Sequence, residues 1–179
     1  MSAGTNTDKL FKFLESKRVK KKDGNEKISH CSMGTPVGSF YVSGPSRDRL
    51  NTLISRSLKD GTVLHLLECP RSHGPIIFDI DIKYHSDNNS RRYEYTQILK
   101  TVEIYNKIIA KYLDVEDEHS HCFITEKKKP NMVSDKIYKD GFHGQYPNIV
   151  ASIETKYLIH REVVQEFEKN DYYKDIMPI

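Results

Sequence analysis

The chain has 179 residues, 28 lysines and arginines against 25 aspartates and glutamates, 37% hydrophobic residues and no tryptophan. A chain of this size buries about 70% of its extended surface, and its 11 tyrosines and 7 phenylalanines argue against wholesale disorder. The apolar runs are too short for a membrane-spanning helix, and the first residues lack the apolar stretch of a signal peptide. We therefore expect an intracellular protein without a membrane partner.

Two amphipathic helices are predicted in the N-terminal part of the chain. The first follows Thr7, and the second is expected to have Ser46 as its N-cap and to end at Asp60-Gly61. A lysine-rich segment, residues 17–27, lies between them. We interpret residues 1–60 as a basic, mainly helical extension with some α/β character.

Residues 61–179 are predicted to form the core of the protein. The expected elements are strands at 62–68 and 76–82, a helix at 92–113, strands at 121–126 and 142–152 joined by a charged loop at 127–140, and a helix from 153. From Ile76 the order is strand, helix, strand, strand, helix, which is typical of a split βαβ, or RRM-like, arrangement without its last strand. We therefore predict an α+β fold in which the first and third strands of this order are neighbours. Because Pro147 lacks an N–H group, strand pairing should end or bulge near Tyr146.

Asp79 and Asp81 are two residues apart on a predicted strand, so both side chains point to one face while the apolar residues between and around them point to the other. Two carboxylates about 5.5 Å apart repel by roughly 3 kcal/mol at an effective dielectric constant of 20. A divalent cation removes this cost, and Mg²⁺ or Mn²⁺ held by one or two carboxylates is typical of phosphoryl transfer. The simpler alternative is a pair of aspartates on a solvated sheet face.

The same DxD spacing occurs in haloacid dehalogenase phosphatases and in nucleotide-sugar glycosyltransferases. A phosphatase would use Asp79 as a nucleophile and would have a threonine at the position of Lys83. The lysine at this position weakens the phosphatase interpretation.

His143 lies on a later alternating strand, with Gln145 on its face and Lys139 and Gly141 just upstream. A histidine beside a metal pair can donate a hydrogen bond to a phosphate oxygen, and Gly141 and Gly144 would allow a ligand to approach the backbone closely. This combination favours a triphosphate ligand, whereas the alternative is a structural histidine bonded to a neighbour.

The segments GPIIFDIDIKY, HCFITE and KDGFHGQYPNIVAS, in this order, resemble the archaeo-eukaryotic primase domain at the N-terminus of the primase-helicases of nucleocytoplasmic large DNA viruses, including poxviruses. The resemblance covers residues 63–168. It implies that Asp79 and Asp81 bind the catalytic divalent metal, and that His143, with Lys139 upstream of it, contacts the phosphates of the incoming nucleotide. It also implies a single-stranded DNA template, nucleoside triphosphates, a helicase domain in the same polypeptide, and a location in the host cytoplasm or a viral replication factory.

This sequence departs from the family in one respect. The family has a third metal-binding carboxylate on a strand beyond the second helix, and only Asp171 and Asp175 remain there. The last core strand is missing from the same region. We therefore expect a C-terminally incomplete piece that binds metal or nucleotide and polymerises poorly.

Basic residues near the predicted site are candidates for template contacts, although such residues are usually only solvated. Each phosphate that they neutralise would steepen the salt dependence of binding by about 0.7 to 0.9 log units. The candidates are Lys127, Lys128, Lys129, Lys83 and Arg71, with the run Lys17, Arg18, Lys20, Lys21 and Lys22 as a second group.

Three other functions fit the sequence less well. A non-enzymatic RRM-like nucleic-acid-binding module would need aromatic residues on the exposed sheet face, whereas Asp79, Asp81, His143 and Gln145 are expected there. Zinc binding by Cys69, His73, His121 and Cys122 is disfavoured because adjacent strand residues face opposite ways. The pair His119 and His121 resembles the motif of rolling-circle nucleases, but Ser120 stands where that motif has a hydrophobic residue. We therefore predict a DNA-dependent primase.

Overall fold

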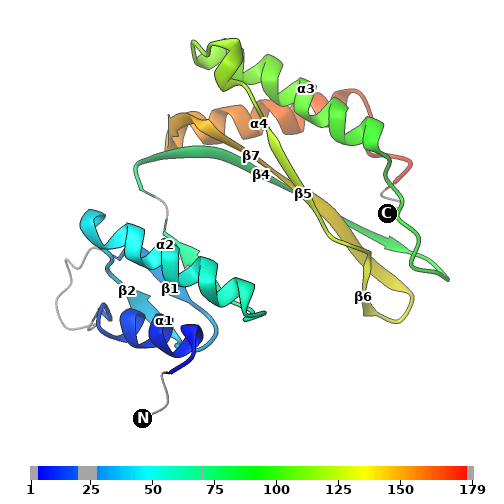
Figure 1. Cartoon of the computed structure of the whole chain (residues 1–179). Helices are drawn as coiled ribbons and strands as arrows, with labels where there is room; N and C mark the ends of the chain where they lie inside the picture. The colour runs from blue at the N-terminus through cyan, green and yellow to red at the C-terminus, as the bar shows by residue number, and fades with distance from the viewer. Residues whose placement is uncertain (1–3, 20–27, 70, 177–179) are drawn as a thin grey trace. The chain divides into compact units, whose positions relative to one another are not determined.

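The computed structural model describes residues 4–19, 28–69 and 71–176 (Figure 1). The lysines at positions 20–22 lie outside the described residues. The chain divides into two compact units, residues 1–71 and 72–179. No described helix combines the length and the apolarity that crossing a membrane requires.

The first unit contains two helices and a small antiparallel sheet. Its elements are α1 (Asn6–Glu15), β1 (His30–Ser32), β2 (Gly38–Phe40), α2 (Gly44–Lys59) and β3 (Leu66–Glu68), with the strand order β2-β1-β3. The two helices pack together, and their apolar faces form a core with the segment that includes β2. This core contains Leu10, Phe13, Leu14, Phe40, Val42, Leu50 and Leu53.

Helix α1 was predicted from the sequence, and α2 ends at Asp60 as predicted. The predicted start of α2 was wrong, because Ser43 rather than Ser46 is its N-cap. The helix begins two residues before Ser46, since Pro45 fits into a first turn, where its missing N–H group costs no helical hydrogen bond.

Strands β1 and β2 were not predicted, because three residues are too few to establish an alternating pattern. Strand β3 corresponds to the predicted strand at 62–68, but it pairs with β1. The two compact units divide between Arg71 and Ser72, and β3 belongs to the sheet of the first unit.

The second unit is a four-stranded antiparallel sheet with two long helices. Its elements are β4 (His73–His85), α3 (Tyr95–Tyr112), a short 3-10 helix (Asp117–His119), β5 (Phe123–Glu126), β6 (Asn131–Ser134), β7 (Ile137–Ser152) and α4 (Ile153–Lys169). The strand order is β4-β7-β5, and β6 also pairs with β7. The α+β class is confirmed, and so is the adjacency of the first and third predicted core strands, which are β4 and β7.

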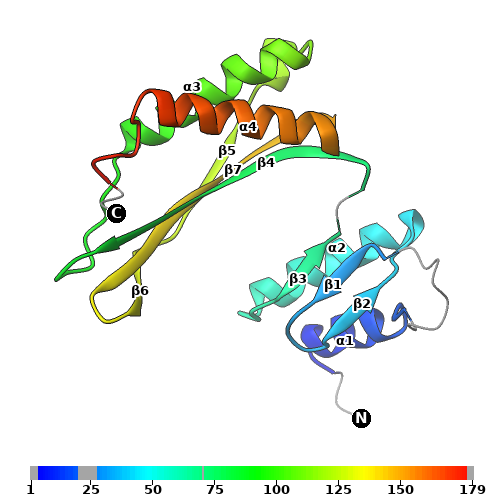
Figure 2. The ribbon, with the colours of Figure 1, turned by 180° about the vertical axis from the view of Figure 1, so that it is seen from behind.

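Helices α3 and α4 cover one face of this sheet, and none of the described helices of the second unit lies on the other face (Figures 1 and 2). The covered face is apolar because every second residue of the strands points into the core. Phe78 of β4 stacks on Tyr105 of α3, with 4.1 Å between ring centroids. We call the other side the open face.

Strand β7 lies between β4 and β5 and holds the sheet together. Its pairing with β4 shifts register where Pro75 faces Val150 but Ile76 faces Tyr146, so three residues of β7 have no partner on β4. The bulge predicted next to Pro147 is therefore confirmed.

The prediction of a continuous loop at 127–140 was wrong. Strands β6 and β7 form a hairpin there, and Lys136 in its turn has a φ of 55°. The charged composition concealed this hairpin, because β6 is exposed throughout and has no buried alternate residues.

Candidate active site

Asp79 and Asp81 both lie on the open face. Along β4 the buried and exposed residues alternate, with Phe78 and Ile82 buried and the two aspartates exposed. The alternation predicted from the sequence is confirmed. About half of each aspartate side chain is accessible to solvent, so both carboxylates are available to a ligand.

His143 of β7 lies directly opposite Asp79 of β4. Its Nδ1 atom is 3.2 Å from the Asp79 Oδ1 atom, and both side chains remain more than one-third exposed. The predicted convergence of these residues, far apart in sequence, is thus present as a cross-strand pair. The His143 side chain is 58% exposed on the open face.

Asp81 is paired with two lysines. The Lys139 Nζ atom is 2.8 Å from Asp81 Oδ2, and the Lys127 Nζ atom is 3.8 Å from Asp81 Oδ1. The Lys139 hydrogen bond, together with the nearby positive charges, holds the pKa of Asp81 below its usual value, although partial burial opposes this effect. The same hydrogen bond raises the pKa of Lys139. Asp81 is therefore a carboxylate at neutral pH.

Arg91, just before α3, holds the segment that carries Lys127. Its Nε atom donates to the Asp140 carboxylate at 2.9 Å, its Nη1 to Glu126 at 2.6 Å, and its Nη2 to the Lys127 carbonyl oxygen. Asp140 is fully buried. Tyr93 adds a second connection by donating from its hydroxyl group to the Gly141 carbonyl oxygen and to Glu126. Arg91 thus joins the end of β5, at Glu126, to Asp140 of β7, which is adjacent to the residue that pairs with Asp81.

Sequence reasoning missed this network. The only signal was Asp140 on the apolar side of an alternating strand, where a carboxylate requires a partner. Neither the residue type nor the spacing identified Arg91 as that partner.

Gly141 and Gly144 have a structural explanation. A Cβ atom at Gly141, whose φ is 149°, would lie 1.9 Å from the Ile80 carbonyl oxygen. One at Gly144 would lie 2.0 Å from the Phe78 ring, which is packed on α3. Both glycines are therefore required by the sheet itself, and a ligand contact at Gly141 stays a prediction.

The other predicted basic residues lie in different places. Lys83 is exposed on the open face opposite Lys139, and Lys128 and Lys129 are exposed in the segment after β5. Arg71 ends the first unit, and Arg18 of that unit is bonded to Glu15. Their contacts with nucleic acid stay predictions.

An aromatic side chain also lies on the open face, contrary to the sequence-based description of that face. Phe123 of β5 is 63% exposed and lies opposite Gln145 of β7. The sequence did not place it there, because four residues of a short edge strand leave the pairing register undetermined.

The donor set of Asp79 and Asp81 fits a hard divalent cation. Carboxylate oxygens are the ligands that Mg²⁺ and Mn²⁺ prefer, and the two side chains share a solvent-accessible face. The lysines on Asp81 balance its charge, and a cation would take over that role. This fit rests on the ligand type, the shared face and the accessibility of the two carboxylates.

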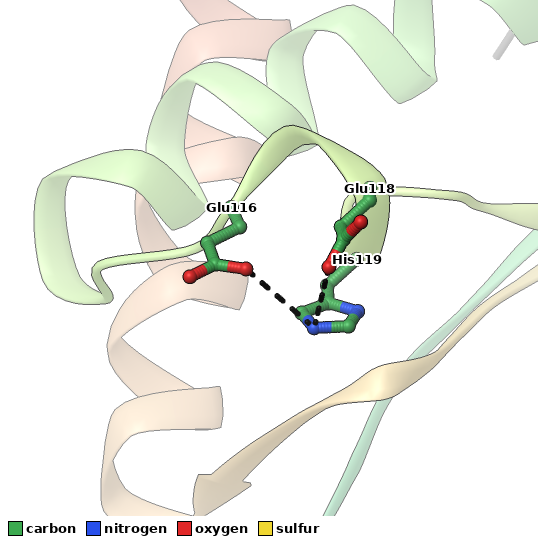
Figure 3. A group of neighbouring side chains, drawn as sticks. All are labelled: Glu116, Glu118 and His119. Atoms are coloured by element: carbon green, nitrogen blue, oxygen red, sulfur yellow. Dashed lines mark ion pairs between the residues drawn. The ribbon is translucent and has the colours of Figure 1, made fainter.

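A separate acidic group lies around the short 3-10 helix. The His119 Nε2 atom is 3.9 Å from Glu116 and 3.7 Å from Glu118, and all three side chains are exposed (Figure 3). Within the part of the chain that is described, it is the one group of three close metal-ligating side chains. The histidine is already paired with both glutamates, so nothing about the group requires a metal.

The two aspartates considered as a third metal ligand follow α4. Asp171 is paired with Lys174 at 3.0 Å. Tyr173 and Ile176, in the same segment, are buried in the core beneath the helices. The segment with Asp171 and Asp175 therefore lies on the covered side of the sheet, and it does not join Asp79 and Asp81.

The second unit thus combines an antiparallel sheet, covered by helices on one face, with a DxD pair beside a histidine on the other face. The family "C962R protein N-terminal AEP domain" matches residues 29–178. The chain therefore belongs to this family of archaeo-eukaryotic primase (AEP) domains. Members of the class generally use divalent metal ions.

Similar curated proteins come from large DNA viruses, and three of them carry the name "Putative helicase". L207/L206 of Acanthamoeba polyphaga mimivirus is 28% identical over 94% of this chain and 18% of its own length. The protein 184R of Invertebrate iridescent virus 6 is 26% identical over 72% of this chain and 15% of its own length. The protein 121R of Invertebrate iridescent virus 3 is 27% identical over 70% of this chain and 14% of its own length. The chain thus spans less than one-fifth of these relatives.

Proposed function

We propose that this chain is the catalytic primase domain of a viral primase-helicase, which synthesises primers on single-stranded DNA from nucleoside triphosphates. The observation that carries the proposal is the cluster of Asp79, Asp81, His143 and Lys139 on the open face. The family match supports the class of activity.

In the proposed reaction, the 3′-hydroxyl group of one nucleotide attacks the α-phosphate of the next and pyrophosphate leaves. Bound Mg²⁺ or Mn²⁺ would lower the pKa of that hydroxyl group and stabilise the charge of the leaving group. Asp79 and Asp81 would hold the cation. In its imidazolium form, with a proton on each ring nitrogen, His143 would donate from Nδ1 to Asp79, which would orient the ring, and from Nε2 to a phosphate oxygen.

The lysines on Asp81 suit an exchange of partners when the nucleotide arrives. Lys139 and Lys127 compensate the Asp81 carboxylate in the structure. When a cation binds Asp81, both ammonium groups become available to the anionic triphosphate. The charge of the site then stays nearly balanced in both states, which limits the electrostatic cost of binding.

The decisive experiment is primer synthesis on single-stranded DNA with Mn²⁺. It compares a longer protein that continues beyond Ile179 with its Asp79→Ala and Asp81→Ala variants. Each substitution removes a metal ligand and is expected to reduce product about 1,000-fold or more, because the metal contributes several kcal/mol to transition-state stabilisation. Asp87→Ala, which removes an exposed aspartate paired with Lys136 beyond β4, is the matched control and should retain activity.

Equal product from all three variants and the unmodified protein would refute the catalytic assignment. For the 179-residue chain alone we propose nucleotide or metal binding with weak polymerisation. Robust primer synthesis by this chain would contradict that part of the proposal.

A non-enzymatic nucleic-acid-binding module is the second candidate, because Phe123 provides an exposed aromatic on the sheet. It predicts DNA binding that survives Asp79→Ala without any primer product from the unmodified protein. The names of the relatives support a helicase domain in the same polypeptide, and we propose the host cytoplasm or a viral replication factory as the location.

A further inference from the structure

An apolar row lies next to the charged site on the open face. Ile77 of β4 and Phe123 of β5 are 67% and 63% exposed. Both lie directly opposite Gln145 of β7, one on each side, so the three side chains form a row across the sheet. Single exposed apolar residues are common on protein surfaces, but two of them aligned across three strands are not explained by folding, which would bury them.

The next row along the strands contains the proposed phosphate ligand. Asp79, His143 and Thr125 face one another there. Residues two apart on one strand lie about 7 Å from each other, so this distance separates His143 from Gln145. The following positions on the same face are Asp81 and, further on, the opposed Lys83 and Lys139. Along the strands, from the Lys83–Lys139 pair towards Gln145, the open face therefore changes from cationic to apolar.

We propose that Phe123 and Ile77 form the surface on which the base of the incoming nucleotide stacks. This inference rests on the proposed function, and it assigns the base side of the same site. The phosphates require the end with Lys139 and His143, because anionic oxygens are stabilised there. With a phosphate at His143, the sugar spans one row and places the base over Phe123.

The chemistry of this row suits a base of any identity. An aromatic ring stacks on the π-face that all bases share, and Ile77 adds apolar contact without directional preference. Gln145, between them, offers one hydrogen-bond donor group and one acceptor to the edge of the base or the sugar. A primase that copies any template sequence needs such tolerance, since Watson–Crick pairing selects the nucleotide.

The test measures affinities of the 179-residue chain by calorimetry in the presence of Mn²⁺. The ligands are dATP, inorganic tripolyphosphate, which has the same phosphates but no base, and a single-stranded DNA oligonucleotide. Phe123→Ala is expected to weaken dATP binding about 5- to 150-fold and to leave tripolyphosphate binding unchanged. Phe123→Trp should retain dATP affinity, since it keeps the aromatic surface. Tyr157→Ala, which removes a 72% exposed aromatic from α4, is the control and should change neither affinity.

The outcomes separate this inference from the function on which it rests. If the unmodified chain binds neither ligand, the nucleotide site itself is wrong. If it binds both and Phe123→Ala leaves the dATP affinity unchanged, the stacking surface is wrong while the phosphate site stands. If Phe123→Ala weakens single-stranded DNA binding but not dATP binding, the row contacts the template instead and the proposal is overturned. Circular dichroism of each variant checks that the fold is intact.

Discussion

Two neighbouring lysines stabilise the ionised form of Asp81. Its carboxylate accepts a hydrogen bond from Lys139 and lies near Lys127. It is also 44% exposed, so solvent screens these contacts and their contribution to stability is small. The pairing matters more for function, because it keeps an ionised ligand available on the open face and orients two ammonium groups beside it.

The lowered pKa of Asp81 predicts a pH dependence with a definite sign. Because the folded-state pKa lies below the unfolded value, the pair stabilises the fold above the unfolded pKa of about 3.9, and this stabilisation is lost as the pH falls through the folded-state pKa. Urea unfolding of the metal-free chain is the measurement. Asp81→Asn should reduce the free energy of unfolding slightly at pH 7, and the difference should shrink at low pH. A difference that grows on acidification would contradict the assignment.

At the residue scale, the sequence predicted where Asp79, Asp81 and His143 lie and missed the residues that support them. Alternation around Asp79 established which face it occupies, and the strand order brought His143 beside it. The sequence did not identify Arg91 as the partner of Asp140, because an arginine in a loop belongs to no periodic pattern. Phe123 was missed because its face depends on a register with β7 that only the folded sheet defines.

At the scale of secondary-structure elements, the buried Asp140 and Arg91 connect β5, β7 and the start of α3. Asp140 is fully buried and its carboxylate is bonded to Arg91 twice, at 2.9 and 3.3 Å. A buried carboxylate is tolerated only with such a partner. The network thereby fixes the exit from β5, and with it the position of Lys127.

Arg91→Ala is expected to lower the free energy of unfolding by about 3 to 5 kcal/mol, because it leaves the Asp140 carboxylate buried without its partner. Arg92→Ala is the matched control. Its guanidinium lies over the Tyr84 ring, and its removal should cost about 1 kcal/mol or less. Chemical denaturation measures both variants.

A double variant tests whether the unpaired Asp140 carboxylate causes the loss of stability in Arg91→Ala. Arg91→Met with Asp140→Leu removes both charges and should recover much of the stability that Arg91→Ala loses. Equal stability of the Arg91→Ala and Arg92→Ala variants would show that Asp140 does not depend on Arg91.

The longer elements were predictable and the short ones were not. Helices α3 and α4 and strand β4 have clear periodicity, and their faces agree with the sequence. The hairpin of β6 and β7 was missed because β6 has only four residues, all of them exposed, and therefore shows no alternation of buried and exposed positions. The boundary between the units depended on β3 pairing with β1, which is a long-range contact.

At the scale of the whole molecule, a net charge of +3 conceals an uneven distribution. The segment after β5 carries three consecutive lysines, of which Lys127 is paired with Asp81, whereas Lys128 and Lys129 are exposed. We propose that these two exposed lysines contact template phosphates.

The double variant Lys128→Gln, Lys129→Gln is expected to reduce the salt dependence of single-stranded DNA binding. Each lost phosphate contact lowers the slope of log K against log salt by about 0.7, so the pair should lower it by about 1.4. Fluorescence anisotropy at several salt concentrations measures the slope. The control Lys107→Gln, on α3, should leave it unchanged. An unchanged slope in the double variant would exclude these lysines from the DNA contact.

The glycine at position 144 has a consequence for the ancestry of such domains. No L-amino acid with a side chain fits there while the Phe78 ring stays stacked on α3, whatever the domain does chemically. A descendant that lost Asp79 and Asp81 through disuse would still retain this glycine. Divergent copies should therefore be traced by the glycine as a mark of descent, and the two aspartates should be used to judge which of those copies still catalyse a reaction.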